Sequence, residues 1–424
     1  MQNFLMKCIE CRKEFNDFDR IRCDCNGLLE IVHDIEKLKE TVSVKNFDKR
    51  LGFKNAPFNS GVWRYKELVA PIENKHIISR PEGNTNLYFS KMVSSFAHVK
   101  NLWLKAEGEN PTMSFKDRGM TVAISAAKKL GYEKVACAST GNTSASMASY
   151  AAFADMDGFV FIPEGNISMG KLAQALAYGS KTLQVEGNFD TAMELVQEAC
   201  SKLGLYLLNS VNPFRIEGQK TIIIEALHQL NFKAPDWVVL PGGNLGNTSA
   251  IGKALKELHE IGIIDSIPRV ATIQASGANP FYESFRDGFE KFSAVKNPQT
   301  IATAIKIGSP VSWKKAAEVI RYTNGVVEEV SDQDIMDAKA CVDRAGIGCE
   351  PASAASVAGL KKLVEKKVIK EYETVVAILT GNMLKDTDAI VNYHNGTLSG
   401  IKSSNTNMPV KVKGNIEEIK KFLG

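Results

Sequence analysis

A lysine in a polar turn is the first residue whose setting suggests chemistry. Lys116 lies in residues 111–119 (PTMSFKDRG), where a helix could begin. In the plainest interpretation, Ser114 and Asp117 form a helix cap and Lys116 is an ordinary solvated charge. A lysine in the first turn of a helix, however, lies at the positive end of the helix dipole, which favours its neutral amine. A neutral lysine amine can form a Schiff base with an aldehyde.

A glycine-rich turn supplies a candidate phosphate site. Residues 241–248 (PGGNLGNT) follow an apolar run and precede a helix expected to begin near Ser249. Glycines allow positive φ and close approach, and main-chain N–H groups at a helix start attract anions. The turn lacks the spacing of nucleoside triphosphate and dinucleotide motifs, so a smaller phosphate ligand remains. Pyridoxal phosphate, an aldehyde with a phosphate, would join this turn to Lys116. The expected phosphate-binding residues are Gly243, Asn244, Leu245, Gly246 and Asn247.

Three further polar turns suit the same cofactor and its substrate. In residues 139–144 (STGNTS), Ser139 and Thr140 could bind a substrate carboxylate, and Asn142 has an amide for the cofactor's phenolic oxygen. Thr380 could place a neutral hydroxyl at the pyridine nitrogen. A second anion site is expected at Asn209, Ser210 and Arg215, because a guanidinium stands there beside small polar side chains. Each turn alone could be a simple strand cap, but together they indicate one site.

The elements that must position these turns alternate along the chain. Short apolar runs, typical of buried parallel strands, alternate with stretches of helical periodicity. This pattern predicts an α/β fold with doubly wound, open parallel sheets, whose ligands bind at the carboxyl ends of the strands. The strands are expected at 135–138, 158–162, 182–185, 205–208, 237–240, 270–273 and 374–379, and the helices at 122–130, 171–178, 191–203, 221–230 and 249–261.

The first 36 residues form a distinct cysteine-rich segment. Two residues lie between the cysteines of the first pair and one residue between those of the second pair. An apolar run at 28–32 follows. Four thiolates in two close pairs suit a tetrahedral zinc site, although the second spacing is shorter than usual. The alternative is a small ribbon that folds without metal. The candidate ligands are Cys8, Cys11, Cys23 and Cys25.

Length and composition bound the remaining possibilities. The 424 residues predict two or three domains, and 44% hydrophobic and 24% charged residues are ordinary for a soluble globular protein. The net charge of +4, without a basic block, does not suggest nucleic-acid binding. We found neither a signal peptide nor an apolar run long enough for a membrane span, so we expect a cytoplasmic protein with reduced thiols.

At these residues the chain resembles the threonine synthases, within the tryptophan synthase β-like enzymes of fold type II. The likeness covers nearly the whole chain up to about residue 395 and includes the cysteine-rich start, which is similar to that of archaeal members. It is carried by segments 82–85 (EGNT), 114–119 (SFKDRG), 139–146 (STGNTSAS), 217–221 (EGQKT), 349–353 (CEPAS) and 379–382 (LTGN). One departure is Met113, where members usually have glycine, so we expect an altered backbone before Lys116.

The resemblance implies two α/β domains behind a zinc-ribbon-like segment at 1–36. Residues 37–100 and 212–424 would form the larger, cofactor-binding domain, and 101–211 the smaller one with the Schiff-base lysine. It also implies that Lys116 holds pyridoxal phosphate, Asn142 bonds its O3′, residues 243–247 bind its phosphate and Thr380 faces its ring nitrogen. Asn209, Ser210 and Arg215 would recognise the phosphate of O-phospho-L-homoserine, which a homodimeric lyase would convert with water into L-threonine and phosphate.

Two other classes of function stay open at this stage. A sister enzyme on the same fold, such as a threonine or serine dehydratase, would need no second anion site, so Arg215 argues against it. An enzyme for O-phosphoserine is harder to separate, because one methylene discriminates by only about 1–3 kcal/mol. A binding or regulatory protein with an inactive α/β body is disfavoured by the presence of Lys116, the glycine-rich turn and Thr380 together.

Overall fold

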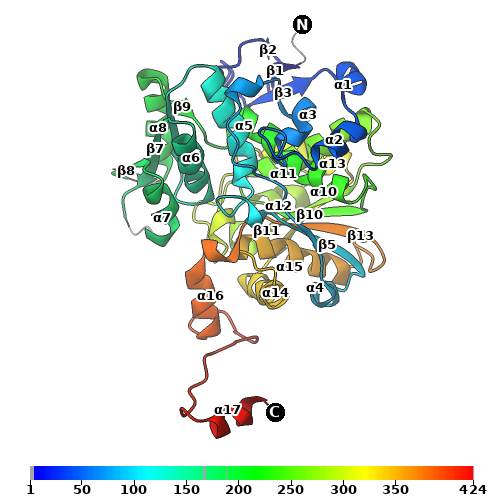
Figure 1. Ribbon diagram of the computed structural model, residues 1–424, viewed down its shortest axis with the longest axis vertical. Helices are drawn as coiled ribbons and strands as arrows, with labels where there is room; N and C mark the ends of the chain where they lie inside the picture. Colours follow the sequence, from blue (N-terminus) through cyan, green and yellow to red (C-terminus); the bar gives the residue numbers. More distant parts are fainter. Residues whose placement is uncertain (1–3, 166–168, 188, 424) are drawn as a thin grey trace.

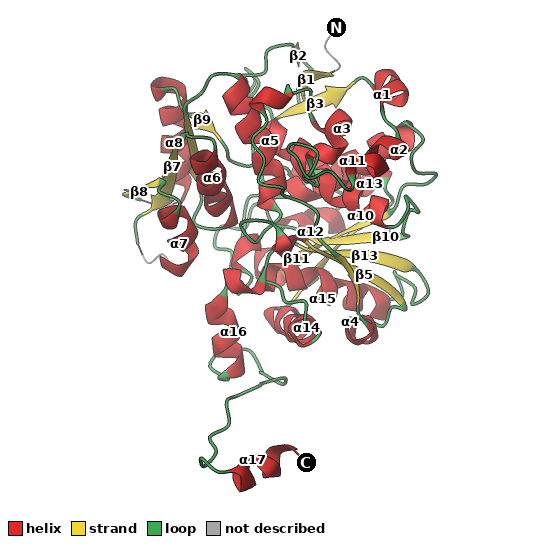
Figure 2. Cartoon of the chain, viewed as in Figure 1, coloured by secondary structure: helices red, strands yellow, loops and turns green. Residues whose placement is uncertain are grey.

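The larger of two parallel sheets lies at the centre of the molecule (Figures 1 and 2). The computed structural model describes residues 4–165, 169–187 and 189–423. The larger sheet has the order β12-β11-β10-β13-β5-β4, and it is parallel except for β4, which pairs antiparallel with β5. Its strands are β4 (Leu87–Phe89), β5 (Asn101–Ala106), β10 (Trp237–Pro241), β11 (Arg269–Ala275), β12 (Val326–Val330) and β13 (Thr374–Leu379).

A smaller parallel sheet has the order β8-β7-β6-β9. Alternate residues of β6 enter different apolar clusters. Val135 and Cys137 pack with helices α5 (Lys116–Lys129) and α6 (Asn142–Phe153), whereas Ala136 and Ala138 pack with α8 (Phe189–Leu203). Helices therefore cover both faces, as expected for a parallel sheet. The strands are β6 (Lys134–Ala138), β7 (Asp157–Pro163), β8 (Lys181–Val185) and β9 (Tyr206–Leu207).

The N-terminal ribbon is a three-stranded antiparallel sheet of order β2-β1-β3, formed by Phe4–Cys8 (β1), Glu14–Phe15 (β2) and Leu29–His33 (β3). It lies at the opposite end of the molecule from α17, which extends away from the body (Figure 1). Apolar ribbon residues join the same buried cluster as residues of α5. The ribbon is thus packed against the body of the molecule.

Helices fill the space between the strands and cover the larger sheet on both sides. One face carries α4, α14 and α15, and the other α10, α11 and α13 (Figure 1). The helices are α1 (Ile35–Thr41), α2 (Val44–Arg50), α3 (Lys66–Val69), α4 (Lys91–Ala97), α5 (Lys116–Lys129), α6 (Asn142–Phe153), α7 (Met169–Ala177), α8 (Phe189–Leu203), α9 (Pro213–Gln219), α10 (Thr221–Gln229), α11 (Gly246–Glu260), α12 (Pro280–Arg286), α13 (Trp313–Tyr322), α14 (Asp332–Arg344), α15 (Pro351–Glu365), α16 (Thr387–His394) and α17 (Ile416–Leu423), with short 3-10 turns η1 (Trp63–Tyr65), η2 (Asn74–His76), η3 (Glu107–Glu109), η4 (Ser276–Ala278), η5 (Thr303–Ile305) and η6 (Met383–Lys385).

The predicted α/β architecture with two open, doubly wound sheets is confirmed, and each predicted strand overlaps an observed one. In the larger sheet, strands β4, β5 and β12 were not predicted. The smaller domain was expected to begin at residue 101. Residues Asn101–Ala106, however, belong to the larger sheet, where they pair with β13. In the described part of the chain, no helix is long and apolar enough to cross a membrane.

Both parallel sheets change winding direction next to the predicted turns. In the larger sheet, β11 and β12 extend to one side of β10, and β13, β5 and β4 to the other. In the smaller sheet, β7 and β8 lie on one side of β6 and β9 on the other. Ligands of open α/β folds bind where the strand order reverses, at the carboxyl ends of the strands. The turns after β6, β9, β10 and β13 are therefore the place to look for a site.

Candidate active site

Lys116 is the first residue of α5, and the end of β13 holds the segment before it. Phe115 N donates to Thr380 O at 2.9 Å, and Asn382 N donates to Met113 O at 3.0 Å. Ser114 and Gly381 form an isolated antiparallel bridge between these contacts. The lysine turn is thus paired to the turn that contains Thr380, which brings two predicted cofactor-binding residues together although more than half of the chain separates them.

The helix start differs from the predicted capping box. Phe115, not Ser114, precedes the first helical residue, and it makes no side-chain cap. The buried Asp117 carboxylate instead accepts hydrogen bonds from Thr112 N at 2.6 Å and Ser146 Oγ at 2.5 Å. Asp117 therefore ties the lysine turn to α6, and burial raises its pKa to about 6. The Ser114 hydroxyl is buried without a hydrogen-bond partner among the described residues.

The glycine-rich turn leaves β10 and opens α11, as predicted. Its left-handed residue is Leu245, with φ 62°, whereas positive φ had been expected of the glycines. At Gly242 the need for glycine comes from the close approach of Thr272, because a Cβ on Gly242 would lie 2.6 Å from Thr272 Cγ2. The main-chain N–H groups of Gly246, Asn247 and Thr248 open the helix and have no acceptor within it.

The chemistry of this turn fits the phosphate end of pyridoxal phosphate. The Asn247 side chain is buried, and neither its oxygen nor its nitrogen has a hydrogen-bond partner among the described residues. An unsatisfied buried amide costs about 1–3 kcal/mol, so an anion that binds here would satisfy existing donors. Gly246 faces α9, because a Cβ there would lie 3.6 Å from Ile216 Cδ1 and 3.9 Å from Gln219 Oε1. The Gln219 oxygen also has no partner.

Thr380 is buried at the carboxyl end of β13, where its hydroxyl lies 2.8 Å from Ser353 Oγ. Ser353 also accepts a hydrogen bond from Gly381 N at 2.8 Å. A neutral hydroxyl held in this way can accept or donate one further hydrogen bond. The side chain is therefore compatible with the predicted contact to a ring nitrogen.

Asn142 is the first residue of α6, and its amide nitrogen faces the carboxylate of Glu350. Its Nδ2 donates to both carboxylate oxygens of Glu350, at 3.2 and 3.1 Å. Glu350 is buried directly before α15, and Gly381 lies so close to it that a Cβ on Gly381 would be 2.5 Å from Glu350 Oε1. Burial raises the pKa of Glu350, while Asn142 and nearby lysines oppose the rise.

Lys116 lies between charges of opposite sign. Burial and the positive charge of Arg215 together lower its pKa to about 7, although the negative charge of Glu350 partly opposes the shift. At pH 7 a large share of such a lysine is the neutral amine, which is the form that attacks an aldehyde. The predicted reactive amine is thus supported by its surroundings as well as by its place at a helix start.

Arg215 is a buried cation on α9 for which the described residues provide no carboxylate. Its side chain is only 2% exposed, its Nη1 donates to Leu208 O at 3.0 Å, and its Nε has no partner. Burial lowers the pKa of Arg215 to about 10, which leaves the guanidinium charged at pH 7. Buried charges are normally paired, so the arrangement fits an anion supplied from outside the chain.

The other predicted substrate residues are positioned differently. The Asn209 amide pairs with β6, because Nδ2 donates to Ala138 O and Oδ1 accepts from Ala138 N, both at 2.9 Å. Asn209 therefore holds the turn after β9 in place, and its Nδ2 keeps a second hydrogen that a phosphate could accept. Ser139 Oγ accepts from Gly141 N at 3.2 Å. Ser139, Thr140 and Ser210 are half-buried.

Glu350 and Lys385 were missed as site residues. Glu350 lies in the quoted segment 349–353, directly before a proline, and a carboxylate at a helix start reads first as a cap. Lys385 is half-buried beside Gln174. Burial lowers the pKa of Lys385, and the negative charges of Glu350 and Asp117 oppose this shift. The residues around Lys385 in the sequence resemble those of a surface turn, so they did not indicate a site residue.

Met113 keeps the backbone that a glycine would favour. Its φ is 68°, in the left-handed region, and its N–H donates to Asn110 O at 2.7 Å. A non-glycine residue there costs about 1 kcal/mol or more. Met113 therefore adopts, at this energetic cost, a conformation that glycine adopts freely.

Comparison with known proteins places these features in a family. A model of pyridoxal-phosphate dependent enzymes matches residues 78–381, which is more than half of the chain. The chain is 46% identical to threonine synthase of Methanocaldococcus jannaschii over 99% of both chains. It is 45% identical to threonine synthase of Methanosarcina acetivorans, over 91% of this chain and 93% of the relative.

Solved structures show the same fold at lower identity. Threonine synthase from Escherichia coli aligns with a TM-score of 0.70 and 17% identity over 99% of both chains. Maize serine racemase aligns with a TM-score of 0.63 and 21% identity over 74% of this chain and 94% of the racemase. The prediction of a fold type II enzyme that uses pyridoxal phosphate is confirmed. The chain belongs to the pyridoxal-phosphate dependent enzymes and, among them, to the threonine synthases.

Proposed function

We propose that this enzyme converts O-phospho-L-homoserine and water into L-threonine and inorganic phosphate. The similarity to threonine synthases over almost the whole chain supports this activity. The observation that carries the substrate assignment is the buried guanidinium of Arg215, which lacks a carboxylate among the described residues and is close enough to Lys116 to lower its pKa. A substrate phosphate would supply the missing negative charge.

Residues of both sheets would hold the cofactor. Lys116 would bind its aldehyde carbon, residues 243–247 its phosphate, Asn142 its phenolic oxygen and Thr380 its ring nitrogen. When bound, pyridoxal phosphate withdraws electrons and acidifies the hydrogens on the substrate's Cα and Cβ. A threonine hydroxyl at the ring nitrogen does not enforce protonation there, unlike a carboxylate. Ser139 and Thr140 would bind the substrate carboxylate.

Lys116 would move the protons. It takes one proton from Cα and one from Cβ, and it returns one to Cγ and one to Cα. The Cγ–O bond breaks with its electron pair on the phosphate oxygen, and the charge of Arg215 stabilises that phosphate as it leaves. Hydroxide from water adds to Cβ, and the remaining proton of that water leaves with phosphate. Ser210 contacts the phosphate beside Arg215, and Asn209 positions the turn.

We also propose that the enzyme is a homodimer that works in the cytoplasm. The dimer rests on the family resemblance, and the cytoplasm on the eight cysteines, all of which lie in the described part of the chain as free thiols and suit a reducing compartment. Light scattering on the purified protein would report the mass in solution, and a monomer mass at micromolar concentration would contradict the dimer.

Replacement of Arg215 tests the substrate assignment. Arg215→Gln should lower kcat/KM for O-phospho-L-homoserine about 10- to 100-fold, because a charge-assisted hydrogen bond is worth about 1.5–3 kcal/mol. It should also weaken inhibition by inorganic phosphate, which a structural role would not explain, while Arg215→Lys should restore part of both. Cofactor absorbance reports that the variants are folded.

The exposed Arg286 offers a control, because Arg286→Gln removes the same charge far from the site. Arg286→Gln should leave unchanged both kcat/KM for O-phospho-L-homoserine and the inhibition by inorganic phosphate. If Arg215→Gln kept full activity and full sensitivity to phosphate, Arg215 would not be the phosphate site.

A further inference from the structure

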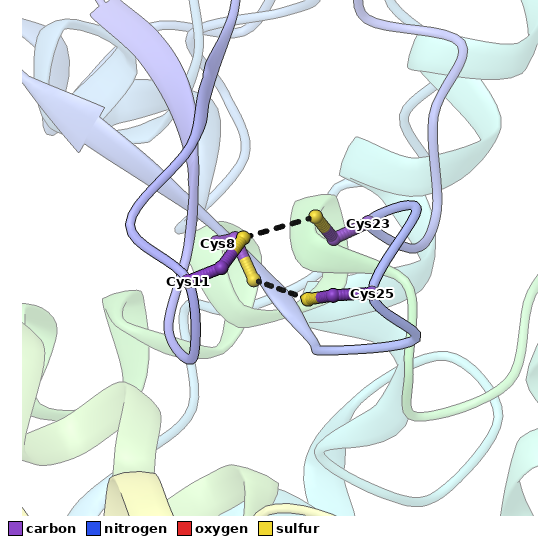
Figure 3. A group of neighbouring side chains, drawn as sticks. All are labelled: Cys8, Cys11, Cys23 and Cys25. Carbon is purple, nitrogen blue, oxygen red and sulfur yellow. Dashed lines mark hydrogen bonds between the residues drawn. The ribbon is translucent and has the colours of Figure 1, made fainter.

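Four thiols meet at one end of the N-terminal ribbon (Figure 3). The sulfur atoms of Cys8 and Cys25 are 3.5 Å apart, and so are those of Cys11 and Cys23. All four lie within 4.8 Å of one another. Cys8 and Cys23 are buried, whereas Cys11 and Cys25 are exposed. The cluster is therefore at the surface but anchored in the packed interior of the ribbon.

We propose that Cys8, Cys11, Cys23 and Cys25 bind a structural zinc ion as four thiolates. A Zn–S bond of about 2.3 Å in tetrahedral geometry places sulfur atoms about 3.8 Å apart, which lies between the 3.5 and 4.8 Å found here. A disulfide would need about 2.05 Å. The sulfur arrangement thus matches a tetrahedral metal site with small adjustments and does not match two disulfides.

The two cysteine turns have the same backbone design despite their unequal spacing. In the first, Arg12 N donates to Cys8 O at 3.1 Å, and in the second, Asn26 N donates to Cys23 O at 2.8 Å. The residue directly after the second cysteine of each pair is left-handed, with φ 62° at Arg12 and 65° at Asn26. The second turn closes with one residue fewer, which explains how a single intervening residue suffices there.

Two neighbours of the cluster suit four thiolates around a metal ion, one by its small size and one by its charge. Gly27 leaves room for the Cys8 thiol, because a Cβ on Gly27 would lie 2.7 Å from Cys8 Sγ. Arg22 is half-buried beside the second turn, where its Nη1 donates to Asn26 O at 2.8 Å and its Nε has no partner. Zinc with four thiolates carries a net charge of −2, which this guanidinium would partly compensate.

A second group of possible ligands, His33, Glu217 and Glu257, does not make a comparable site. Lys220 Nζ lies 2.6 Å from carboxylate oxygens of both glutamates, and Lys253 also pairs with Glu217. Ammonium groups thus occupy the place that a cation would take. Among the described residues, the cysteine cluster is the group of candidate ligands whose atoms face no competing cation.

The zinc ion would stabilise a ribbon that supports the active site. Strand β3 contacts α9, which carries Arg215, and His33 Nε2 lies 2.8 Å from Glu217 on that helix. Lys315 Nζ donates to Leu29 O at 2.9 Å. Loss of the metal would loosen these contacts and lower the thermal unfolding midpoint of the whole enzyme.

Metal analysis of the full-length enzyme tests the proposal. Protein purified without chelators should contain zinc in equal molar amount to the chain, and replacement by Co²⁺ should give the thiolate-to-metal and d–d absorbance of a tetrahedral four-sulfur site. The double variant Cys11→Ser, Cys25→Ser should lose the metal and unfold at lower temperature. Because both side chains are exposed, it should still fold and bind pyridoxal phosphate.

The matched control is Cys341→Ser, which removes a half-buried thiol on α14 and should keep the metal. Three results would overturn the proposal: a folded wild-type enzyme without stoichiometric zinc, iron in its place, or zinc retained by the double variant. Alkylation of the unreduced protein followed by mass spectrometry would expose disulfides, and two such bonds in the ribbon would equally contradict a zinc site.

Discussion

Lys116 combines two requirements of a reactive lysine, a lowered pKa and a fixed backbone. Burial lowers the pKa to about 7, and the nearby charges of Arg215 and Glu350 act on it in opposite directions. The main-chain contacts to β13 hold it beside Thr380. The same side chain on an open surface would be charged at pH 7 and would react slowly with an aldehyde.

The rate at which the apo-enzyme captures pyridoxal phosphate should follow this titration. Neutral amine accumulates as pH rises through the pKa, so the rate should increase up to about pH 7 and then level off. Glu350→Gln removes a negative charge and should move the midpoint to lower pH, whereas Arg215→Gln should move it to higher pH. Stopped-flow absorbance measures these rates.

The exposed Glu365, at the end of the helix that Glu350 precedes, supplies the control. Glu365→Gln should leave the midpoint in place. A wild-type rate that still rises tenfold per pH unit above pH 9, or two active-site variants that shift in the same direction, would contradict the assignment of Lys116.

Sequence patterns placed the turns with Lys116, Thr380 and the glycines at strand ends and helix starts, as observed, but did not give their side-chain partners. The pairing of Asn142 with Glu350 and of Asn209 with Ala138 depends on segments far apart in the chain. Local spacing carries no information about such contacts, which arise when the two sheets come together.

At the scale of elements, buried charges explain why β5 and β12 were missed, and they provide much of the stability around the lysine helix. In β5, Lys105 is fully buried, and in β12, Glu328 is 3% exposed. Charged residues inside short apolar runs weaken the strand signal. Each has a partner: Lys105 Nζ lies 2.7 Å from Glu225, and Glu328 pairs with Lys366 at 2.6 Å.

The Glu225 carboxylate joins three elements. It pairs at 2.7 Å with Lys105 on β5 and with Arg118 on α5, and Arg118 also pairs with Glu107 at 2.7 Å. Glu225→Gln should cost about 3–5 kcal/mol of unfolding free energy, because it leaves a positive charge buried without compensation. Glu260→Gln, at an exposed pair with Lys256, should cost less than about 1 kcal/mol. Chemical denaturation would measure both.

The pH dependence of the wild type has a defined sign. Despite burial, Lys105 and Arg118 hold the pKa of Glu225 well below its ordinary value of 4.5. Its contribution to stability is therefore complete above about pH 4.5 and is lost as pH falls below that value. Denaturation midpoints of Glu225→Gln should fall less steeply than those of the wild type between pH 5 and pH 3, and parallel curves would contradict this role.

At the scale of the whole molecule, the site depends on two sheets that reverse their winding at neighbouring edges. The larger sheet contributes the glycine-rich turn and Thr380, and the smaller one contributes Asn142 and the turn after β9. The sequence could predict that each turn lies at a strand end, but not that helices α5 and α9 would bring Lys116 and Arg215 together. The ribbon supports α9 from outside the site.

Product analysis tests the proposed reaction most directly. Purified enzyme with pyridoxal phosphate and O-phospho-L-homoserine should release L-threonine and inorganic phosphate in equal amounts, because each substrate loses one phosphate and gains one water. Phosphate without threonine, a 2-oxo acid with ammonia, or activity confined to threonine or O-phosphoserine would contradict the proposed function.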